Sequence, residues 1–291
     1  MTPYAVVTPV RNESENLRRV ADSLAAQTAR PAVWMIVDTG SDDDTAGVIC
    51  ELVAAHDWIA TCSSDAVAGP TRARAIVRGF NTGVAKLGEL PEVVVKLDAD
   101  ISLEPDYFER LVRAFDEDAG LGIASGTRYE RIAGEWQQRH VTGDHVWGAT
   151  RAYRRGCLEQ VSPLEERLGW DGIDEIKAAL RGWRTRTLLD LPFFHHRREG
   201  EREGPRARAW ATVGDASHYL GYRPDYLVFR ALNYARRDVA ALAMIAGYAG
   251  AAVRRSDRCP DADVRSFVRS QQTLRRLPDR MREALGRRAA A

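Results

Sequence analysis

The sequence has little cysteine and no paired cysteine spacing. Its four cysteines are scattered among 291 residues without a Cys-x-x-Cys pair. This pattern argues against a zinc site or a disulfide framework and indicates a reducing compartment. The N-terminus also lacks the basic and apolar segments of a secretory signal. We therefore expect a cytoplasmic protein.

A long hydrophobic run is also missing, and charge is unevenly distributed. Residues 205–291 hold 17 arginines, eight acidic residues and no lysine, a net charge of +9, which leaves −8 on residues 1–204. The apolar run 239–253, between Arg236-Arg237 and Arg254-Arg255, has 15 residues. A spanning helix needs ~20. This region is therefore interpreted either as a peripheral anchor at the inner face of an anionic membrane or as a buried helix pair that packs on the rest of the protein or joins a homodimer.

Strand and helix patterns alternate in the first part of the chain. Short apolar runs predict strands at residues 4–8, 33–37, 58–62 and 93–97, each followed by a helical pattern. This alternation predicts an α/β fold with a doubly wound, mostly parallel sheet. Asn12 to Glu15 has capping-box spacing, and Pro105 is expected in the first turn of the helix after the fourth strand.

The rhythm changes after residue 119. We expect strands at 121–129 and 185–194, a helix at 171–180 that Gly182 ends, an irregular stretch at 130–156 and a charged loop at 197–209. The remainder is predicted to be mainly helical. The domain prediction is therefore a catalytic domain 1–204, with halves 1–118 and 119–204, and a basic, helical C-terminal region 205–291.

Two acidic residues end the strand at 93–97. Asp98 and Asp100 are two positions apart, so their side chains point to the same side of an extended chain. The carboxyl ends of strands in open α/β sheets are where ligands bind. The pair therefore predicts a site for one divalent cation that also bridges a substrate's phosphates. The alternative is that both residues only form a turn and cap a helix.

Three motifs together resemble family 2 glycosyltransferases of the GT-A fold. They are Thr8-Pro9-Val10-Arg11-Asn12-Glu13, Val37-Asp38-Thr39-Gly40-Ser41 with Asp43 and Thr45, and Leu97-Asp98-Ala99-Asp100. The resemblance implies that Thr8, Pro9, Arg11, Glu13, Asp38 and Asp98 contact a nucleotide-sugar. Thr39 stands where the family usually has a second aspartate. The base therefore stays open among UDP-, GDP- and dTDP-sugars.

The resemblance also implies contacts for the diphosphate and the donor sugar. Arg72, Arg74 and Arg78 lie in a segment similar to the family's basic helix, and Arg74 is our choice for the diphosphate because arginine binds phosphates through two parallel bonds. Trp147-Gly148 is similar to the segment beneath the donor sugar. For Trp147, core packing is the alternative.

A catalytic base is implied in the second half of the chain. In the family it is the aspartate of a Glu-Asp pair about eleven residues before a Gly-aromatic pair. Here Gly182-Trp183 places it at Asp171, with Trp170 in place of the glutamate. Asp174 is the alternative base, and a purely capping role is the alternative for Asp171.

His195-His196 ends the strand at 185–194 and is similar to the third metal ligand of several GT-A enzymes. Only one of the two can face the site, and we favour His195. An imidazole ligand favours Mn²⁺ over Mg²⁺. The arginine-rich loop that follows is expected to act as a lid over the diphosphate.

The functional prediction is a metal-dependent, inverting glycosyltransferase. It would move a sugar from a nucleotide-sugar to a hydroxyl of a carbohydrate or lipid-linked acceptor, in cell-envelope, exopolysaccharide or glycolipid synthesis. We expect no nucleic-acid partner. The alternatives are a sugar-nucleotide nucleotidyltransferase, although the first loop lacks a glycine-rich phosphate cradle, and a non-catalytic nucleotide-sugar-binding protein at a membrane.

Overall fold

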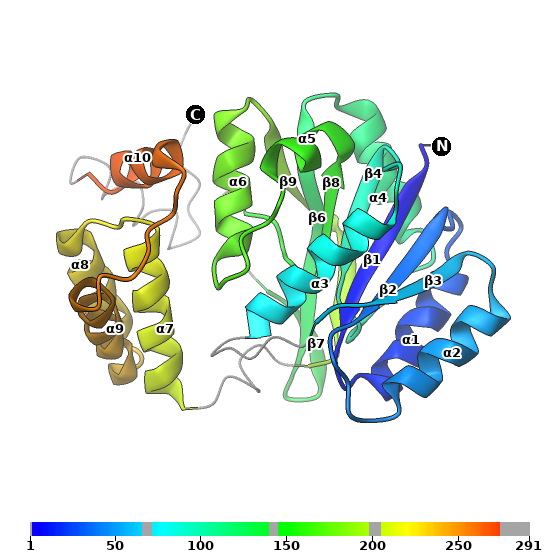
Figure 1. Cartoon of the computed structure of the whole chain (residues 1–291), viewed down its shortest axis with the longest axis horizontal. Coiled ribbons are helices and arrows are strands. Elements are labelled where there is room, and N and C mark those ends of the chain that lie inside the picture. Colours follow the sequence, from blue (N-terminus) through cyan, green and yellow to red (C-terminus); the bar gives the residue numbers. More distant parts are fainter. Residues whose placement is uncertain (1, 66–71, 140–144, 198–204, 274–291) are drawn as a thin grey trace. The chain divides into compact units, whose positions relative to one another are not determined.

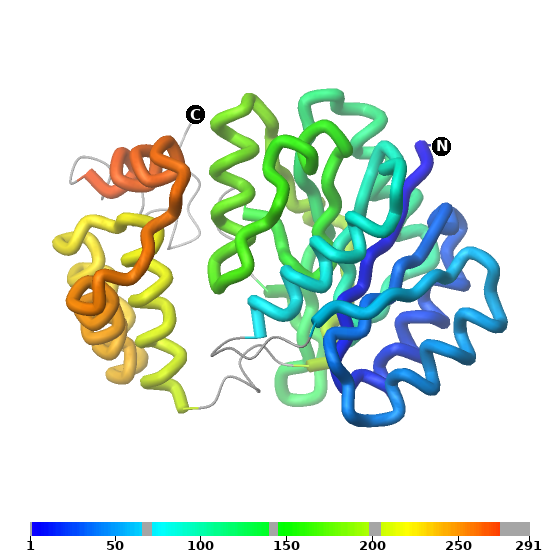
Figure 2. Tube along the Cα trace, in the orientation of Figure 1, coloured from blue at the N-terminus to red at the C-terminus, as the bar shows by residue number. Residues whose placement is uncertain are grey.

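The structure is a computed structural model that describes residues 2–65, 72–139, 145–197 and 205–273. The chain divides into two units, Met1–Arg198 and Glu199–Ala291, and each is described by itself (Figures 1 and 2). The predicted domain boundary after residue 204 directly follows residues 198–204, which lie outside the described residues. The division of the first unit into halves at 118 stays a prediction.

Four parallel strands form the N-terminal half of the sheet in unit 1. They are β1 (Tyr4–Val10), β2 (Val33–Asp38), β3 (Ile59–Ser63) and β4 (Val93–Leu97), in the spatial order β3-β2-β1-β4. Every residue of β1 and β4 is buried. These strands are continuous apolar runs because both of their faces are covered by helices. Their carboxyl ends therefore meet at one edge of the sheet.

The second half of the sheet is mixed. It consists of β5 (Ile101–Leu103), β6 (Leu121–Ile132), β7 (Glu135–Gln138), β8 (Thr150–Arg154) and β9 (Arg184–His195). β8 runs antiparallel to β4, and β6 pairs in parallel with β9, so that the order continues β4-β8-β6-β9-β5. Strand β9 comes late in the sequence, but it ends beside β5. Strand β5 directly follows Asp98 and Asp100 in the sequence.

Helices cover both faces of the sheet. One apolar cluster joins the sheet to α1 (Ser14–Ala25), α2 (Thr45–Ala55) and α4 (Tyr107–Glu117). The other joins it to α3 (Arg72–Lys86), α5 (Arg155–Val161) and α6 (Trp170–Leu180). Figure 1 shows α3 crossing in front of the sheet. The predicted doubly wound α/β fold is confirmed.

Helix α3 lies unusually close to β1 and β2. A Cβ atom on Gly83 would lie 2.5 Å from Val7 and 2.8 Å from Val37, and one on Gly79 would lie 2.9 Å from Pro9. Real Cβ atoms do not approach so closely, so glycine is required at both positions. This close packing brings the N-terminal part of α3 to the loops at the carboxyl ends of β1 and β2.

Several local predictions are wrong. Asn12 does not cap α1: its φ of 56° is left-handed, and its amide group pairs with Asp42, 2.6 Å away. Helix α4 begins at Tyr107, so Pro105 precedes its first turn. The stretch 130–156 contains β7, β8 and the start of α5, because β7 pairs with β6 and β8 pairs with β4. Residues 206–209, predicted as loop, begin α7.

The C-terminal unit is helical in its described part, as predicted. It contains α7 (Arg206–Tyr219), α8 (Pro224–Ala235), the 3₁₀ turn η1 (Val239–Leu242), α9 (Ala243–Val253) and α10 (Ala262–Gln271). A Cβ on Gly214 of α7 would lie 2.0 Å from the carbonyl oxygen of Met244, so α7 and α9 touch through their backbones. Most of the apolar run 239–253 is therefore a helix packed against α7. In the described part of the chain, no helix combines the length and hydropathy needed to cross a bilayer.

Candidate active site

Three ligand-type side chains converge at the end of β4. One oxygen each of Asp98 and Asp100 and one ring nitrogen of His195 lie within 4.8 Å of one another. The sheet explains this meeting: β5 pairs antiparallel with β9, with Ile101 opposite His195, and the His196 N–H donates to the carbonyl oxygen of Asp100 at 2.9 Å. The acidic turn is thereby held against the end of β9.

The two histidines face different surroundings. His195 Nε2 lies 3.0 Å from Asp100 Oδ1, and its Nδ1 is buried without a hydrogen-bond partner among the described residues. His196 Nε2 instead lies 2.8 Å from Ser102 Oγ, and its ring contacts Trp136. Two carboxylates with one incompletely bonded imidazole fit a divalent cation such as Mn²⁺. His195 belongs to this cluster and His196 does not.

Positive side chains balance the acidic cluster. Lys96, buried in β4, donates to Asp98 Oδ1, and Arg197 Nη1 lies 3.1 Å from Asp100 Oδ2. Burial alone would raise the pKa of Asp100, but the hydrogen bond and charge of His195, with the charge of Arg197, lower this pKa to about 2. The aspartate is therefore ionised at neutral pH and available to a cation.

Glu13 connects the first loop to the end of β9. Its two carboxylate oxygens each accept a hydrogen bond of 2.8 Å from Arg197, and Arg72 lies 3.6 Å away. Burial would raise the pKa of Glu13, but the bonds from Arg197 and Asn16 lower it. Glu13 is only 6% exposed, so it holds Arg197 beside Asp100 through a buried ion pair. The rest of the predicted lid, 198–204, lies outside the described residues.

The other residues of the β1 loop that were predicted to contact the nucleotide-sugar differ in burial. Thr8 is fully buried, and its hydroxyl accepts a 2.8 Å hydrogen bond from Trp34 Nε1. Pro9 is also buried, against α3, whereas Arg11 is exposed. A ligand would therefore meet the backbone of this loop and the side chain of Arg11.

Asp38 organises its own turn. Its Oδ1 accepts hydrogen bonds from the N–H groups of Gly40 and Ser41, at 3.2 and 2.9 Å, and from the Ser41 hydroxyl, at 2.8 Å. The adjacent Thr39 is buried and donates to the carbonyl oxygen of Val10 at 3.0 Å. The Asp38 carboxylate thus shapes the turn at the end of β2. Its contact with a base or ribose stays a prediction.

The arginines of α3 share acidic partners. Arg78 donates to Glu166 Oε2 at 2.7 Å, and Arg74 lies 3.7 Å from the same oxygen. Arg72 pairs with Glu13, which also binds Arg197 beside Asp100. Arg74 is 46% exposed and only loosely paired, so its side chain is free to turn toward a diphosphate.

Asp171 and Asp174 occupy contrasting environments on α6. Asp171 is partly exposed in the first helical turn, and the one hydrogen bond that its side chain accepts from the described residues is local, from the N–H of Gly172 at 3.1 Å. Asp174 is 2% exposed and receives two hydrogen bonds from Arg151 and one from Tyr153. Burial raises the pKa of Asp174 to about 7, and the charge of Arg151 opposes the rise. Of these two carboxylates, Asp171 is the one accessible to solvent, and its role as the base stays a prediction.

The segment 147–149 joins Asp171 to the acidic cluster. The carbonyl oxygen of Gly148 accepts a 2.9 Å hydrogen bond from Lys96, and the Asp98 N–H donates to the carbonyl oxygen of Ala149 at 2.8 Å. A Cβ on Gly148 would lie 3.9 Å from Asp171 Oδ2. The predicted base, the predicted sugar-binding segment and the acidic cluster therefore form one site.

Aromatic rings line this site beside cations. Lys96 Nζ lies 5.7 Å from the centre of the Trp170 ring, and Arg151 Cζ lies 5.5 Å from it. Trp170 therefore packs near two cations at the position where the family has an acidic residue. Arg128 Cζ lies 5.2 Å from the centre of the Trp147 ring. One face of Trp147 is thus occupied, and stacking on a sugar stays a prediction.

Two site residues were missed by sequence reasoning. Lys96 interrupts an otherwise apolar strand, and this lone charge was a signal that it has a buried partner. Arg151 is fully buried and holds α6 by contacts with Asp174, Glu175 and the carbonyl oxygen of Asp171, and it also donates to the carbonyl oxygen of Val146. Nothing in its sequence context distinguished it from neighbouring arginines.

A comparison with protein families settles the relationship. Residues 5–163 match the model of "Glycosyl transferase family 2". The chain belongs to this family. The match includes all three motifs at the carboxyl ends of β1, β2 and β4, and so it covers Asp98 and Asp100. The matched residues end before α6. The assignment of Asp171 as the candidate base therefore depends on the geometry described above.

The names of two curated relatives refer to a polyprenol monophosphomannose and to undecaprenyl phosphate. The chain is 31% identical over 178 residues to the polyprenol monophosphomannose synthase of Mycolicibacterium smegmatis, covering 54% of this chain and 63% of that protein. It is 30% identical over 180 residues to the undecaprenyl-phosphate 4-deoxy-4-formamido-L-arabinose transferase of Serratia proteamaculans, covering 56% and 52%. The chain thus spans less than two thirds of the length of either relative.

Solved structures show the same fold. The mannosyltransferase PcManGT from Pyrobaculum calidifontis, in complex with GDP-Man and Mn²⁺, superposes with a TM-score of 0.57 at 17% identity, covering 98% of this chain and 88% of that one. GalNAc-T7 with UDP, GalNAc and Mn²⁺ gives 0.55 at 14% identity, covering 73% and 48%. At these identities the likeness establishes the GT-A fold alone.

Proposed function

We propose that this family 2 protein is an inverting, metal-dependent glycosyltransferase that transfers a sugar from a nucleotide-sugar to an acceptor hydroxyl. The observation that supports this proposal is that the candidate metal ligands lie close to the candidate base. Asp98, Asp100 and His195 are linked to Asp171 through Lys96 and Gly148. The family match favours transfer over the nucleotidyltransferase and scaffold alternatives.

The residues divide the reaction between them. Asp171 would accept the proton of the attacking hydroxyl as the new bond to the anomeric carbon forms and the bond to the diphosphate oxygen breaks. Arg72 and Arg74 would bind the diphosphate, and Asp38 with the β1 loop would bind the nucleoside. A divalent cation held by Asp98, Asp100 and His195 would stabilise the charge on the departing diphosphate. A single displacement of this kind inverts the configuration.

An assay of nucleotide diphosphate release tests the proposal. UDP-, GDP- and dTDP-sugars are each combined with Mn²⁺ and with either a polyprenyl phosphate or an oligosaccharide acceptor. The polyprenyl phosphate is included because the names of two relatives contain it. We expect release from one donor class, and only when an acceptor is present. Release of pyrophosphate would instead support the nucleotidyltransferase, and binding without turnover would support the scaffold.

We also propose that the C-terminal unit contacts an anionic membrane, where a lipid-linked acceptor would lie. Large apolar side chains are exposed on α8 and η1, among them Phe229, Leu232 and Val239. Arg236 and Arg237 lie between the last two of these in the sequence. An apolar surface with adjacent arginines is typical of helices that lie in the membrane interface. The attachment surface is thus the α8–η1 corner, since most of the run 239–253 packs on α7.

Replacing Leu232 and Val239 with serine is expected to weaken binding to anionic liposomes. These side chains are 55% and 73% exposed, so their loss should leave the fold intact. In the membrane-bound state these two side chains would be buried in the membrane interface. Losing them should therefore weaken liposome binding by ~10-fold or more. Flotation assays at low salt measure it. Leu189→Ser, at a residue 54% exposed in unit 1, is the control. Equal binding by all variants would contradict the proposed surface.

A further inference from the structure

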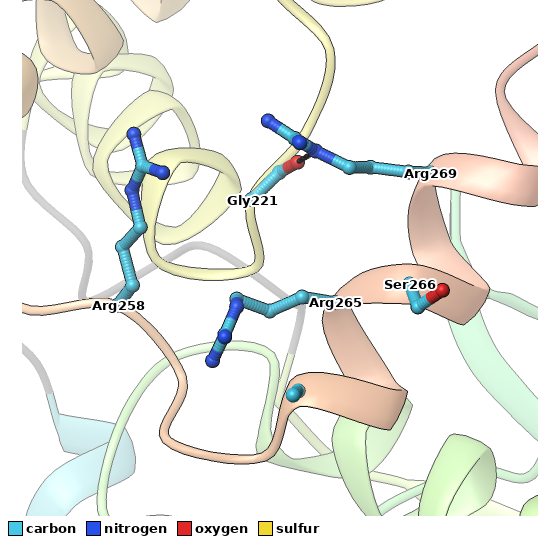
Figure 3. A pocket seen from close by; sticks show the side chains of 6 residues that line it. Gly221, Arg258, Arg265, Ser266 and Arg269 are labelled. Atoms are coloured by element: carbon cyan, nitrogen blue, oxygen red, sulfur yellow. Dashed lines mark hydrogen bonds between the residues drawn. The ribbon is translucent and has the colours of Figure 1, made fainter.

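A pocket rich in arginine lies within the C-terminal unit. Its volume is about 240 Å³, and it is lined by Gly221, Arg258, Ala262, Arg265, Ser266 and Arg269. Ala262, Arg265, Ser266 and Arg269 follow the i, i+3, i+4, i+7 spacing, so they form one face of α10. Figure 3 shows Arg265 and Arg269 extending from α10 toward the turn at Gly221, with Arg258 on the segment that precedes the helix.

Backbone contacts hold two of these arginines in position. Arg269 Nε donates to the carbonyl oxygen of Gly221 at 2.9 Å, and Arg265 Nη1 donates to that of Cys259. Each guanidinium has five donor hydrogens, so both keep several donors for another partner. The side chains are ordered before a ligand arrives, which lowers the entropic cost of binding it.

The positive charge of this pocket is not neutralised within the described part of the unit. Among residues 205–273, no carboxylate oxygen lies within 4.0 Å of a side-chain nitrogen of Arg258, Arg265 or Arg269. Nearby Arg223, by contrast, forms a 2.7 Å ion pair with Asp225. No acidic residue lines the pocket. Three cations around one cavity attract an anion.

We propose that this pocket binds a phosphoryl group. Guanidinium groups match the oxygens of phosphate through paired, charge-assisted hydrogen bonds, and the Ser266 hydroxyl adds a neutral donor. The group is carried either by a lipid headgroup or by a soluble phosphate. The pocket is lined by none of the residues assigned to the transfer reaction, so the proposal does not depend on the proposed activity.

A pair of charge-matched variants tests the site. Ser266→Asp places a negative charge inside the pocket, and Ser270→Asp places the same charge one turn further along α10, outside the pocket lining. Both serines are exposed, so neither change should unfold the helix. Inorganic phosphate is titrated into the full-length protein in EDTA, and the backbone amide NMR signals of residues 258–269 report local binding. Any phosphate bound in unit 1 contributes equally to both variants.

We expect Ser266→Asp to raise the phosphate Kd by about ten-fold or more, because a like charge is added beside the ligand. Ser270→Asp should change it by less than about three-fold, since that charge is exposed and screened. In a second arm, a selective loss of binding to phosphatidic acid vesicles by Ser266→Asp identifies a lipid headgroup. Unchanged vesicle binding identifies a soluble phosphate. If neither phosphate nor vesicles distinguish the two variants, the proposal is wrong.

Discussion

Replacing Asp171 with asparagine is expected to lower the rate of sugar transfer by ~10²–10⁴-fold, the range for loss of a general base. Asparagine has the same shape but cannot accept a proton. Within the described part of the chain, the Asp171 side chain accepts a local bond from the N–H of Gly172 and no other, so the fold should not change. Donor affinity, measured by calorimetry, should stay within a few-fold. A rate measured at saturating donor and acceptor then isolates the chemical step.

Asp174→Asn is the contrasting variant. It removes the charge that faces Arg151 in the buried ion pair and should lower the free energy of unfolding by about 3 kcal/mol. Its activity, measured on the folded fraction, should largely persist. If Asp171→Asn stays active and folded Asp174→Asn does not, the base has been assigned to the wrong carboxylate.

The Asp171→Asn variant also distinguishes between a hydroxyl acceptor and a phosphate acceptor. A hydroxyl must lose a proton to attack, whereas a phosphate oxygen is already ionised at neutral pH. With a polyprenyl phosphate acceptor, the loss of rate should therefore be much smaller than with a sugar hydroxyl. Comparing both acceptors on the same variant separates general-base catalysis from a simple effect on the site's shape.

Removing divalent ions is expected to weaken nucleotide binding by at least about ten-fold, because the diphosphate then faces Asp98 and Asp100 without a bridging cation. Calorimetry with UDP, GDP and dTDP, in Mn²⁺ and in EDTA, measures this effect without any need for turnover. Asp100→Asn should reduce the gain that Mn²⁺ provides.

His196→Ala is the matched control for the metal site. His196 adjoins His195 in sequence but contacts Ser102 and Trp136. Substituting His195 with alanine should weaken Mn²⁺-dependent binding, and substituting His196 should not. Equal nucleotide affinity in Mn²⁺ and EDTA would exclude the metal assignment. Equal effects of the two histidine variants would mean that His195 has only a packing role.

The local sequence was sufficient to predict the α/β fold and the positions of its first four strands along the chain. Runs that are apolar at nearly every position, such as 93–97 with Lys96 as its one polar residue, are recognisable because a strand covered on both faces has no polar side. The acidic pair also follows from sequence, since Asp98 and Asp100 directly end a buried strand. The three motifs identified the family because each lies at the carboxyl end of a parallel strand, where local spacing is enough to place it.

Tertiary structure decided everything that depends on partners distant in the chain. His195 joins the acidic cluster, and His196 does not, because β5 pairs with β9 in one register, and a shift of one residue would exchange them. The sequence favoured Asp171 by its spacing and left Asp174 as the alternative, and the structure separates them because the carboxylate of Asp174 pairs with the buried Arg151 of β8. Lys96 donates to Asp98 and to the carbonyl oxygen of Gly148, and Gly148 is 52 residues away in the sequence. Such pairings depend on the packing of separate segments, which local sequence patterns do not encode.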